Sequence, residues 1–270
     1  MAWTNVKIGD ILRLQGKGKL ALSRFELARA GISTLGEHLS ENLNWRQSLS
    51  VVQNDIGVVL RAEQMHERAL KSFQDALAEI SGLLFRDDKQ ITWLSIKAWS
   101  EDNIGDTKIR WAWKEMQNGN AEEAKKVLDG AGQILHRALE TRARLTQLAP
   151  ENNRWRVDYA ISKANAKAYV GTIDELEERY IAAGNNFIMA AQENSFITVN
   201  DDRMDDVVIR TIEFYERAGR DYRKGMFEER GLELLMEALK TAQDYSPRAL
   251  NREALSSIAD RLQDQIEKKR

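Results

Sequence analysis

Histidine and carboxylate side chains are the groups in this 270-residue sequence that could bind a metal ion or transfer protons. The three histidines, His38, His66 and His136, fall far apart, and no two stand four residues apart as a His-Glu-x-x-His zinc site requires. The absence of cysteine excludes disulfides, thiolate metal ligands and a cysteine nucleophile. We therefore predict surface or partly packed histidines, no metal site, no cofactor, no catalytic residue and no enzymatic activity.

Two further patterns could suggest chemistry. Residues 15–19 (QGKGK) resemble a phosphate-binding loop, but Ile11 stands where that loop needs its first glycine and no Ser or Thr follows the lysine. We interpret the segment as a turn between helices. Acidic pairs at 87–88, 201–202 and 205–206 fall at expected connectors and helix starts, where carboxylates cap free N–H groups, and we interpret them as caps.

Charge and composition limit the classes of partner. The chain has 40 Lys+Arg against 42 Asp+Glu, a net charge of −2, and no basic block that would attract nucleic acid. No apolar run approaches the roughly 20 residues of a membrane span, and no secretory signal stands at the start. We expect a cytoplasmic protein that binds neither nucleic acid nor membrane. The chain has only 2 prolines, which argues against a loop-rich all-β fold.

A pattern of small and aromatic residues recurs along the chain. Gly57 is followed by Ala69, Phe73 and Ala76, and the same residue types follow Gly9 at the same spacing. The positions of the glycine column are 9, 57, 105, 167 and 219, and a lysine interrupts it at 167. We infer five units, of which the fourth is degenerate and the third carries about seven extra residues before its turn.

Each unit has the apolar spacing of two helices joined by a short turn. The predicted units are residues 2–41, 45–86, 93–149, 155–197 and 203–245, followed by a capping helix at 248–268, all in one domain spanning 1–270. Both prolines, Pro150 and Pro247, fall in connectors between units. The glycines should let the two helices approach closely. We expect Gly9, Gly57 and Gly105 to face Ala21, Ala69 and Ala124, and Phe25, Phe73, Leu128 and Leu235 to fill space toward the next unit.

This spacing resembles the tetratricopeptide repeat (TPR), over roughly residues 2–245, and the lengthened units look like those of bacterial TPR proteins. The resemblance implies an all-α fold, a right-handed α-solenoid of about five TPR-like helical hairpins plus the capping helix. It also implies a concave groove that binds a peptide, a helix or a partner domain.

In such a solenoid the first helix of each hairpin lines the groove. In the third unit one face of that helix carries Trp99, Asp102, Asp106, Ile109 and Trp113. This stripe is either a set of partner-binding anchors or the filling that a long helix needs. Arg61, Arg220 and Arg223 are further candidates, and surface salt bridges are the alternative for the last two. The equivalent positions of the fourth unit are Ile161, Ala164, Ala168 and Gly171. The Lys/Asn/Arg clamp of chaperone-binding TPR proteins is not reproduced.

We therefore predict a protein–protein interaction scaffold or adaptor that binds a partner protein or peptide. The alternative is a regulatory or sensor module of a larger or co-encoded bacterial signalling or defence enzyme. Trp3 lies at an uncapped amino-terminal end of the predicted solenoid. A second copy of the chain or a preceding domain could cover that end.

Overall fold

The computed structural model describes residues 2–38, 43–195, 204–245 and 252–268. Within these ranges the chain forms twelve helices and no strand, which confirms the predicted all-α fold. The helices are α1 (Ala2–Leu14), α2 (Gly18–His38), α3 (Asn44–Ala62), α4 (His66–Leu84), α5 (Ile91–Gln117), α6 (Ala121–Leu128), α7 (Ala131–Leu148), α8 (Asn153–Leu176), α9 (Tyr180–Ser195), α10 (Met204–Lys224), α11 (Glu228–Tyr245) and α12 (Arg252–Glu267).

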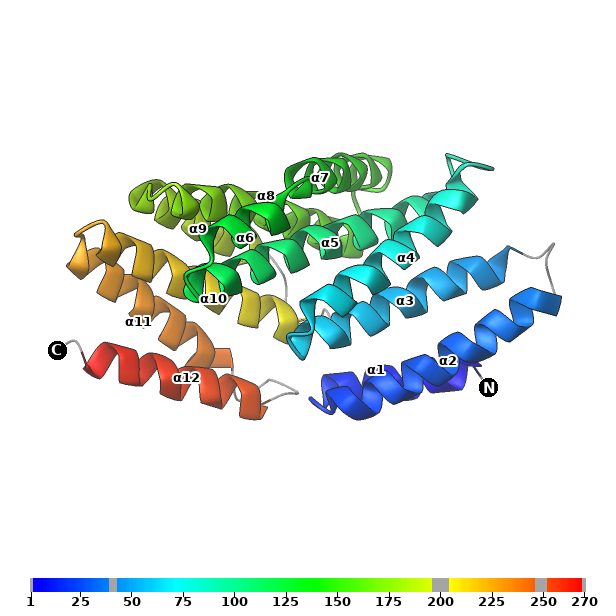
Figure 1. The fold of residues 1–270 in the computed structure, drawn as a ribbon, viewed down its shortest axis with the longest axis horizontal. Coiled ribbons are helices and arrows are strands. Elements are labelled where there is room, and N and C mark those ends of the chain that lie inside the picture. The colour runs from blue at the N-terminus through cyan, green and yellow to red at the C-terminus, as the bar shows by residue number, and fades with distance from the viewer. Residues whose placement is uncertain (1, 39–42, 196–203, 246–251, 269–270) are drawn as a thin grey trace. The chain divides into compact units, whose positions relative to one another are not determined.

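The chain divides into two compact units, an amino-terminal unit of residues 1–148 and a carboxy-terminal unit of residues 149–270. The sequence predicted one domain over this length. In the amino-terminal unit α1 packs on α2, α3 on α4, and α5 on both α6 and α7. The second helix of one pair also packs on the first helix of the next, α2 on α3 and α4 on α5. Figure 1 shows α3 and α4, in blue and cyan, running side by side.

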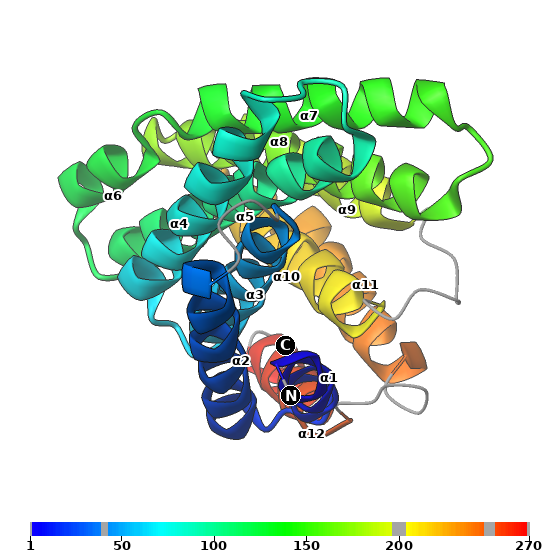
Figure 2. The same ribbon diagram turned by 90° about the vertical axis from the view of Figure 1, so that its right-hand side faces the viewer.

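The carboxy-terminal unit repeats this nearest-neighbour packing. Helices α8 and α9 form one pair, α10 and α11 form another, and α9 packs on α10. Figure 2 shows the α10 and α11 pair in yellow and orange. Helix α12 packs on α11 and buries Leu255, Leu262 and Ile266 against it, as the predicted capping helix should.

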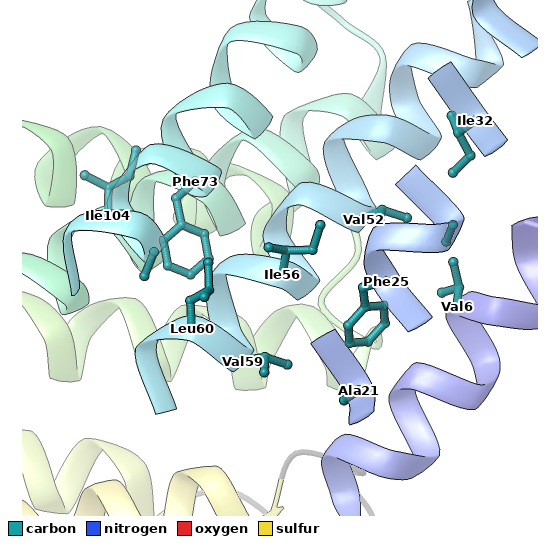
Figure 3. Close-up of a cluster of buried hydrophobic side chains, with 12 residues drawn as sticks. Val6, Ala21, Phe25, Ile32, Val52, Ile56, Val59, Leu60, Phe73 and Ile104 are labelled. Atoms are coloured by element: carbon teal, nitrogen blue, oxygen red, sulfur yellow. The ribbon is translucent and has the colours of Figure 1, made fainter. Parts of the chain in front are cut away.

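The first two glycines of the pattern lie under aromatic rings. A Cβ on Gly57 would lie 2.5 Å from Phe73, and one on Gly9 would lie 2.7 Å from Phe25. Both rings are fully buried within an apolar cluster shared by α1 to α5, shown in Figure 3. The prediction that these rings fill space toward the next unit is therefore corrected. Each ring fills the space between the two helices of its own pair. It fits there because the facing residue is a glycine, which has no side chain.

The same contact exists in the predicted degenerate unit, at a glycine that the sequence analysis misplaced. A Cβ on Gly171 of α8 would lie 3.1 Å from Phe187 of α9. Ala183, Phe187 and Ala190 follow Gly171 at the spacing by which Ala69, Phe73 and Ala76 follow Gly57, and all three are fully buried. Gly171, not Lys167, therefore belongs to the glycine column, and the α8–α9 pair follows the pattern in full.

The third pair is longer than predicted. A Cβ on Gly105 of α5 would clash with Leu135 of α7, not with Leu128 of α6. Leu135 stands 14 residues further from its glycine than Phe73 does from Gly57, so the insertion is 14 residues. Half of it lengthens α5 to 27 residues. The other half adds α6, which is separated from α7 at Gly130, where φ is +67°.

The turn within each pair has one backbone conformation. A residue with positive φ follows the glycine of the pattern by seven positions at Gly16, Gln64, Glu178 and Met226, and by 14 at Gly119. The next residue donates its N–H to the carbonyl five residues earlier, as Met65 does to Leu60 and Phe227 to Tyr222. This is the Schellman end of an α-helix. Residues 15–17 lie in such a turn and residues 18–19 begin α2, which confirms that the segment joins two helices.

The connectors also match the predictions where they are described. Pro150 lies between α7 and α8, where no helical hydrogen bond is lost, whereas Pro247 lies outside the described residues. Asp87 Oδ1 accepts from the Lys89 N–H at 3.1 Å, so this acidic pair does cap a turn. The side chains of the other two acidic pairs lie outside the described residues.

Candidate functional site

The five predicted residues of α5 do not form one exposed surface. Trp99 and Trp113 are half-buried, whereas Asp102, Asp106 and Ile109 are 5%, 6% and 0% exposed. Ile109 is a core residue. The two tryptophans stand seven residues on either side of Asp106, so the helical period places all three along one line of α5.

Asp102 holds α5 against α7. Its Oδ2 lies 3.4 Å from Arg142 Nε, and Arg142 Nη1 also donates to Ser95 Oγ at 3.2 Å. Arg142 is only 3% exposed, so the ion pair is buried. A buried pair of this kind fixes the packing of the two helices, and Asp102 is therefore a structural residue.

Asp106 instead faces α3, where the sequence placed Arg61. Arg61 Nη1 lies 2.9 Å from Asp106 Oδ2 and donates to Asn103 Oδ1 at 2.8 Å. Arg110, one turn further along α5, lies 3.2 Å from the same Asp106 oxygen. The structure thus brings together two of the predicted residues, Arg61 and Asp106. We call Arg61, Asn103, Asp106, Arg110 and Lys114, which stands one further turn along α5, the α3–α5 cluster.

Three cations act on a histidine at the α3–α5 cluster. Arg61, Arg110 and Lys114 surround the imidazole of His66, which stacks on Trp111 with ring centroids 6.5 Å apart. Burial, with those three cations, lowers the pKa of His66 to about 4, so this histidine is neutral at pH 7. Asp106 is the acid that opposes this effect.

The next acid along α5, Glu115, contributes negative charge beside these cations, since it interacts with Lys114. Glu115 accepts from Trp111 Nε1 and from Asn120 Nδ2.

Asn103 offers the cluster a spare hydrogen-bond donor. The side chain is 7% exposed, and its Nδ2 has no hydrogen-bond partner within the described part of the chain. A buried amide N–H₂ without an acceptor is costly, typically about 1–3 kcal/mol. An acceptor atom brought in by a ligand would satisfy it, and the neighbouring guanidinium groups favour an anionic acceptor.

The two predicted arginines of α10 lie in separate ion pairs. Arg220 Nη1 is 4.0 Å from Glu216 Oε1, and Arg223 Nε donates to Glu228 Oε1 at 2.8 Å. Glu216 also accepts from Arg261 Nη2 at 2.7 Å, which ties α12 to α10. The predicted alternative for these arginines, salt bridging, describes both contacts.

Sequence reasoning missed a buried junction between α8 and α10. Arg217 Nη2 donates to Glu175 Oε2 at 2.7 Å and to Thr172 Oγ1 at 3.0 Å. Burial alone would raise the pKa of Glu175, but Arg217, with Lys224 and Arg220, holds that pKa below its usual value. The spacing after Gly171 was the signal that could have found this junction. When the positions that face the groove are counted from Gly171 and not from Lys167, each shifts by four residues along α8. The position that was assigned to Gly171 then falls on Glu175.

The other predicted groups take no part in these clusters. His136 is exposed and lies 3.2 Å from Glu140, and the side chain of His38 lies outside the described residues. Trp3 is 54% exposed on α1. No helix in the described ranges is long and apolar enough to cross a membrane. Across the same ranges, no three acidic or histidine side chains are arranged to hold a metal ion.

A comparison with models of protein families and a search of curated proteins both find no match to this chain.

Proposed function

We propose that this chain is a protein-interaction module that holds a partner segment along the face of α5 that meets α3. The helix pairs would be TPR-like hairpins of a right-handed solenoid, and this face would lie in its concave groove. The shared spacing of glycine, alanine and phenylalanine and the nearest-neighbour packing support this assignment. Binding in such a module requires no chemistry and no cofactor.

The observation that carries the proposal is the unpaired amide donor of Asn103 within the α3–α5 cluster. It lies beside Arg61, and the cations of the cluster act on the neighbouring His66. A carboxylate of a partner protein would supply the acceptor that this donor lacks, and its negative charge would be favoured beside the cations. Arg61 is ordered by Asp106 and Asn103 before any partner binds, so less side-chain entropy is lost on binding.

The flanking tryptophans suggest the rest of the partner segment. Trp99 and Trp113 lie about 10 Å from Asp106 along the helix axis, one on each side. Both are half-buried, so part of each indole can contact a partner. Half-exposed tryptophans beside charged groups are typical anchors of protein interfaces. The expected partner segment therefore carries acidic residues between apolar ones.

Selection from a random peptide library displayed on phage tests this function. The wild-type protein should enrich peptides that place Asp or Glu next to apolar residues. Arg110→Ala should weaken the selected peptides about 10-fold, the typical effect of losing one charge-assisted hydrogen bond. Trp113→Ala should also weaken them. Lys126→Ala is the matched control, because Lys126 is an exposed cation of α6 paired with Glu123.

Two outcomes would contradict the proposal. One is enrichment of peptides without acidic residues, or of peptides that bind Arg110→Ala and wild type equally. The other is failure to enrich any peptide when a known peptide-binding domain, selected in parallel, enriches its own.

A further inference from the structure

Asp221 of α10 is a buried carboxyl group that the proposed partner-binding face does not use. It is 0% exposed, and neither of its side-chain oxygens has a hydrogen-bond partner among the described residues. The matching position, two residues after the glycine of the pattern, is Val59 in α3 and Thr107 in α5. Val59 lies in the apolar core, and the Thr107 hydroxyl donates to the Asn103 carbonyl. Asp221 thus places an acid where α3 and α5 place a buried residue without charge.

Charged groups from α8 and α10 surround this acid. From α8 the facing group is Glu175, which already accepts from Arg217. From α10 itself they are Arg217, Arg220 and Lys224.

The other two neighbouring helices contribute groups at the same end of α10. On α9 the ring of Tyr180 lies 5.1 Å from Lys224 Nζ, and on α11 the carboxylate of Glu228 is engaged by Arg223.

The two carboxyl groups differ in their hydrogen bonds. Burial, with the negative charge of Glu175, raises the pKa of Asp221 to about 8 in spite of the three cations. Glu175 has the guanidinium of Arg217 and remains ionised. At pH 7 the pair therefore carries one negative charge and one proton, and the proton resides on Asp221.

We propose that the protonation state of Asp221 controls the contact between α8 and α10. With its proton, Asp221 leaves Arg217 free to bind Glu175 and Thr172, which holds the two helices together. Without it, a second desolvated carboxylate repels Glu175 and attracts the guanidinium of Arg217, which stands one turn earlier on α10. The bonds from Arg217 to α8 weaken, and the α8–α10 contact loosens as the pH rises through the mildly alkaline range.

Hydrogen exchange of the full-length chain, followed by mass spectrometry at pH 7 and pH 9, tests whether Asp221 controls this contact. The rates are corrected for the intrinsic pH dependence of exchange. Between pH 7 and pH 9 the ionised fraction of Asp221 should rise from roughly one in ten to roughly nine in ten. Wild-type amides of α8 near Thr172 and of α10 near Arg217 should therefore lose about 10-fold in protection. Asp221→Asn should keep its protection at pH 9, because the amide cannot ionise.

Asp55→Asn is the matched control. Asp55 of α3 is another acid whose pKa is raised to about 8, by burial and by Asp10, but it lies in the amino-terminal unit. Its substitution should leave the pH response of α8 and α10 unchanged. Asp221→Val, which copies Val59, serves if the amide variant does not fold, and it should also be insensitive to pH.

Equal loss of protection in wild type and in the Asp221 variants would overturn the proposal. So would constant protection of α8 and α10 in wild type between pH 7 and pH 9. A loss abolished by Asp55→Asn would also overturn it, since the response would then originate in the other unit.

Discussion

The ring of Phe73 fills the space that a side chain on Gly57 would occupy: a Cβ there would lie 2.5 Å from Phe73 Cε1. Because Phe73 is fully buried, its ring cannot move aside without disturbing the core. Gly57→Ala should therefore lower the free energy of unfolding by about 1–3 kcal/mol, the usual cost of overpacking. Urea denaturation measures this directly.

Gly31 of α2 provides the matched control. A Cβ there would meet only Ala2 Cβ, at an ordinary contact distance of 3.5 Å. Gly31→Ala should stabilise the protein by about 0.5–1 kcal/mol, because alanine loses less backbone entropy in a helix. Destabilisation of the same size by both substitutions would contradict the role assigned to Gly57.

The turn between α10 and α11 should be improved by a glycine. Met226 has φ of +68°, a left-handed conformation that costs a residue with a Cβ about 1–2 kcal/mol relative to glycine. Its side chain is 93% exposed, so little packing would be lost. Met226→Gly should raise the free energy of unfolding by about 1 kcal/mol. Gly16→Ala, at the matching position of the first turn, should lower it, and a stabilising Gly16→Ala would refute this explanation.

Asp102 and Asp106 should respond differently to substitution, although both lie on the predicted stripe. Asp102→Ala leaves Arg142 buried without its carboxylate, which typically costs about 3–5 kcal/mol. Thermal denaturation should show a large drop in Tm. Glu122→Ala breaks an exposed pair with Lys125 and should leave Tm nearly unchanged. If both variants have the same Tm as wild type, Asp102 is not the structural residue described above.

His66 should stay neutral well below pH 6.5. Its pKa is lowered from 6.5 to about 4, so the unfolded chain takes up this proton first as the pH falls. The stability that His66 contributes is therefore complete above about pH 6.5 and is lost as the pH falls toward 4. NMR titration of the imidazole measures the pKa. Lys114→Ala, which removes one of the lowering charges, should raise it. An equal pKa in wild type and Lys114→Ala would show that Lys114 does not act on His66.

The helix pairs were predictable because a close contact between two helices limits the residue types that can make it. Tryptophan was a poorer guide. Trp93 and Trp155 each donate their backbone N–H to a capping side chain three residues earlier, Gln90 and Asn152, so they mark where a helix begins. The distance from a helix start to its glycine varies with helix length, which is why counting from Trp155 led to Lys167 and missed Gly171.

The candidate site was predictable only in part. The helical period placed Trp99, Asp106 and Trp113 on one face, and Arg61 on the neighbouring helix. It could not show that Asp102 turns toward α7, because its partner Arg142 stands 40 residues away, beyond an insertion whose length was underestimated. The effect of Arg61 on His66 was also hidden, since only the fold brings these side chains together.

Charge reversal across the proposed interface is the most direct test of the account's central claim, that the α3–α5 cluster binds an acidic partner segment. The dissociation constants of one selected peptide and of its Glu→Lys counterpart would be measured, by calorimetry, against wild type and Lys114→Glu. We expect each reversal alone to weaken binding about 10-fold or more, and the two together to restore part of the loss. The claim would be contradicted if the changes in binding free energy from the two reversals simply added.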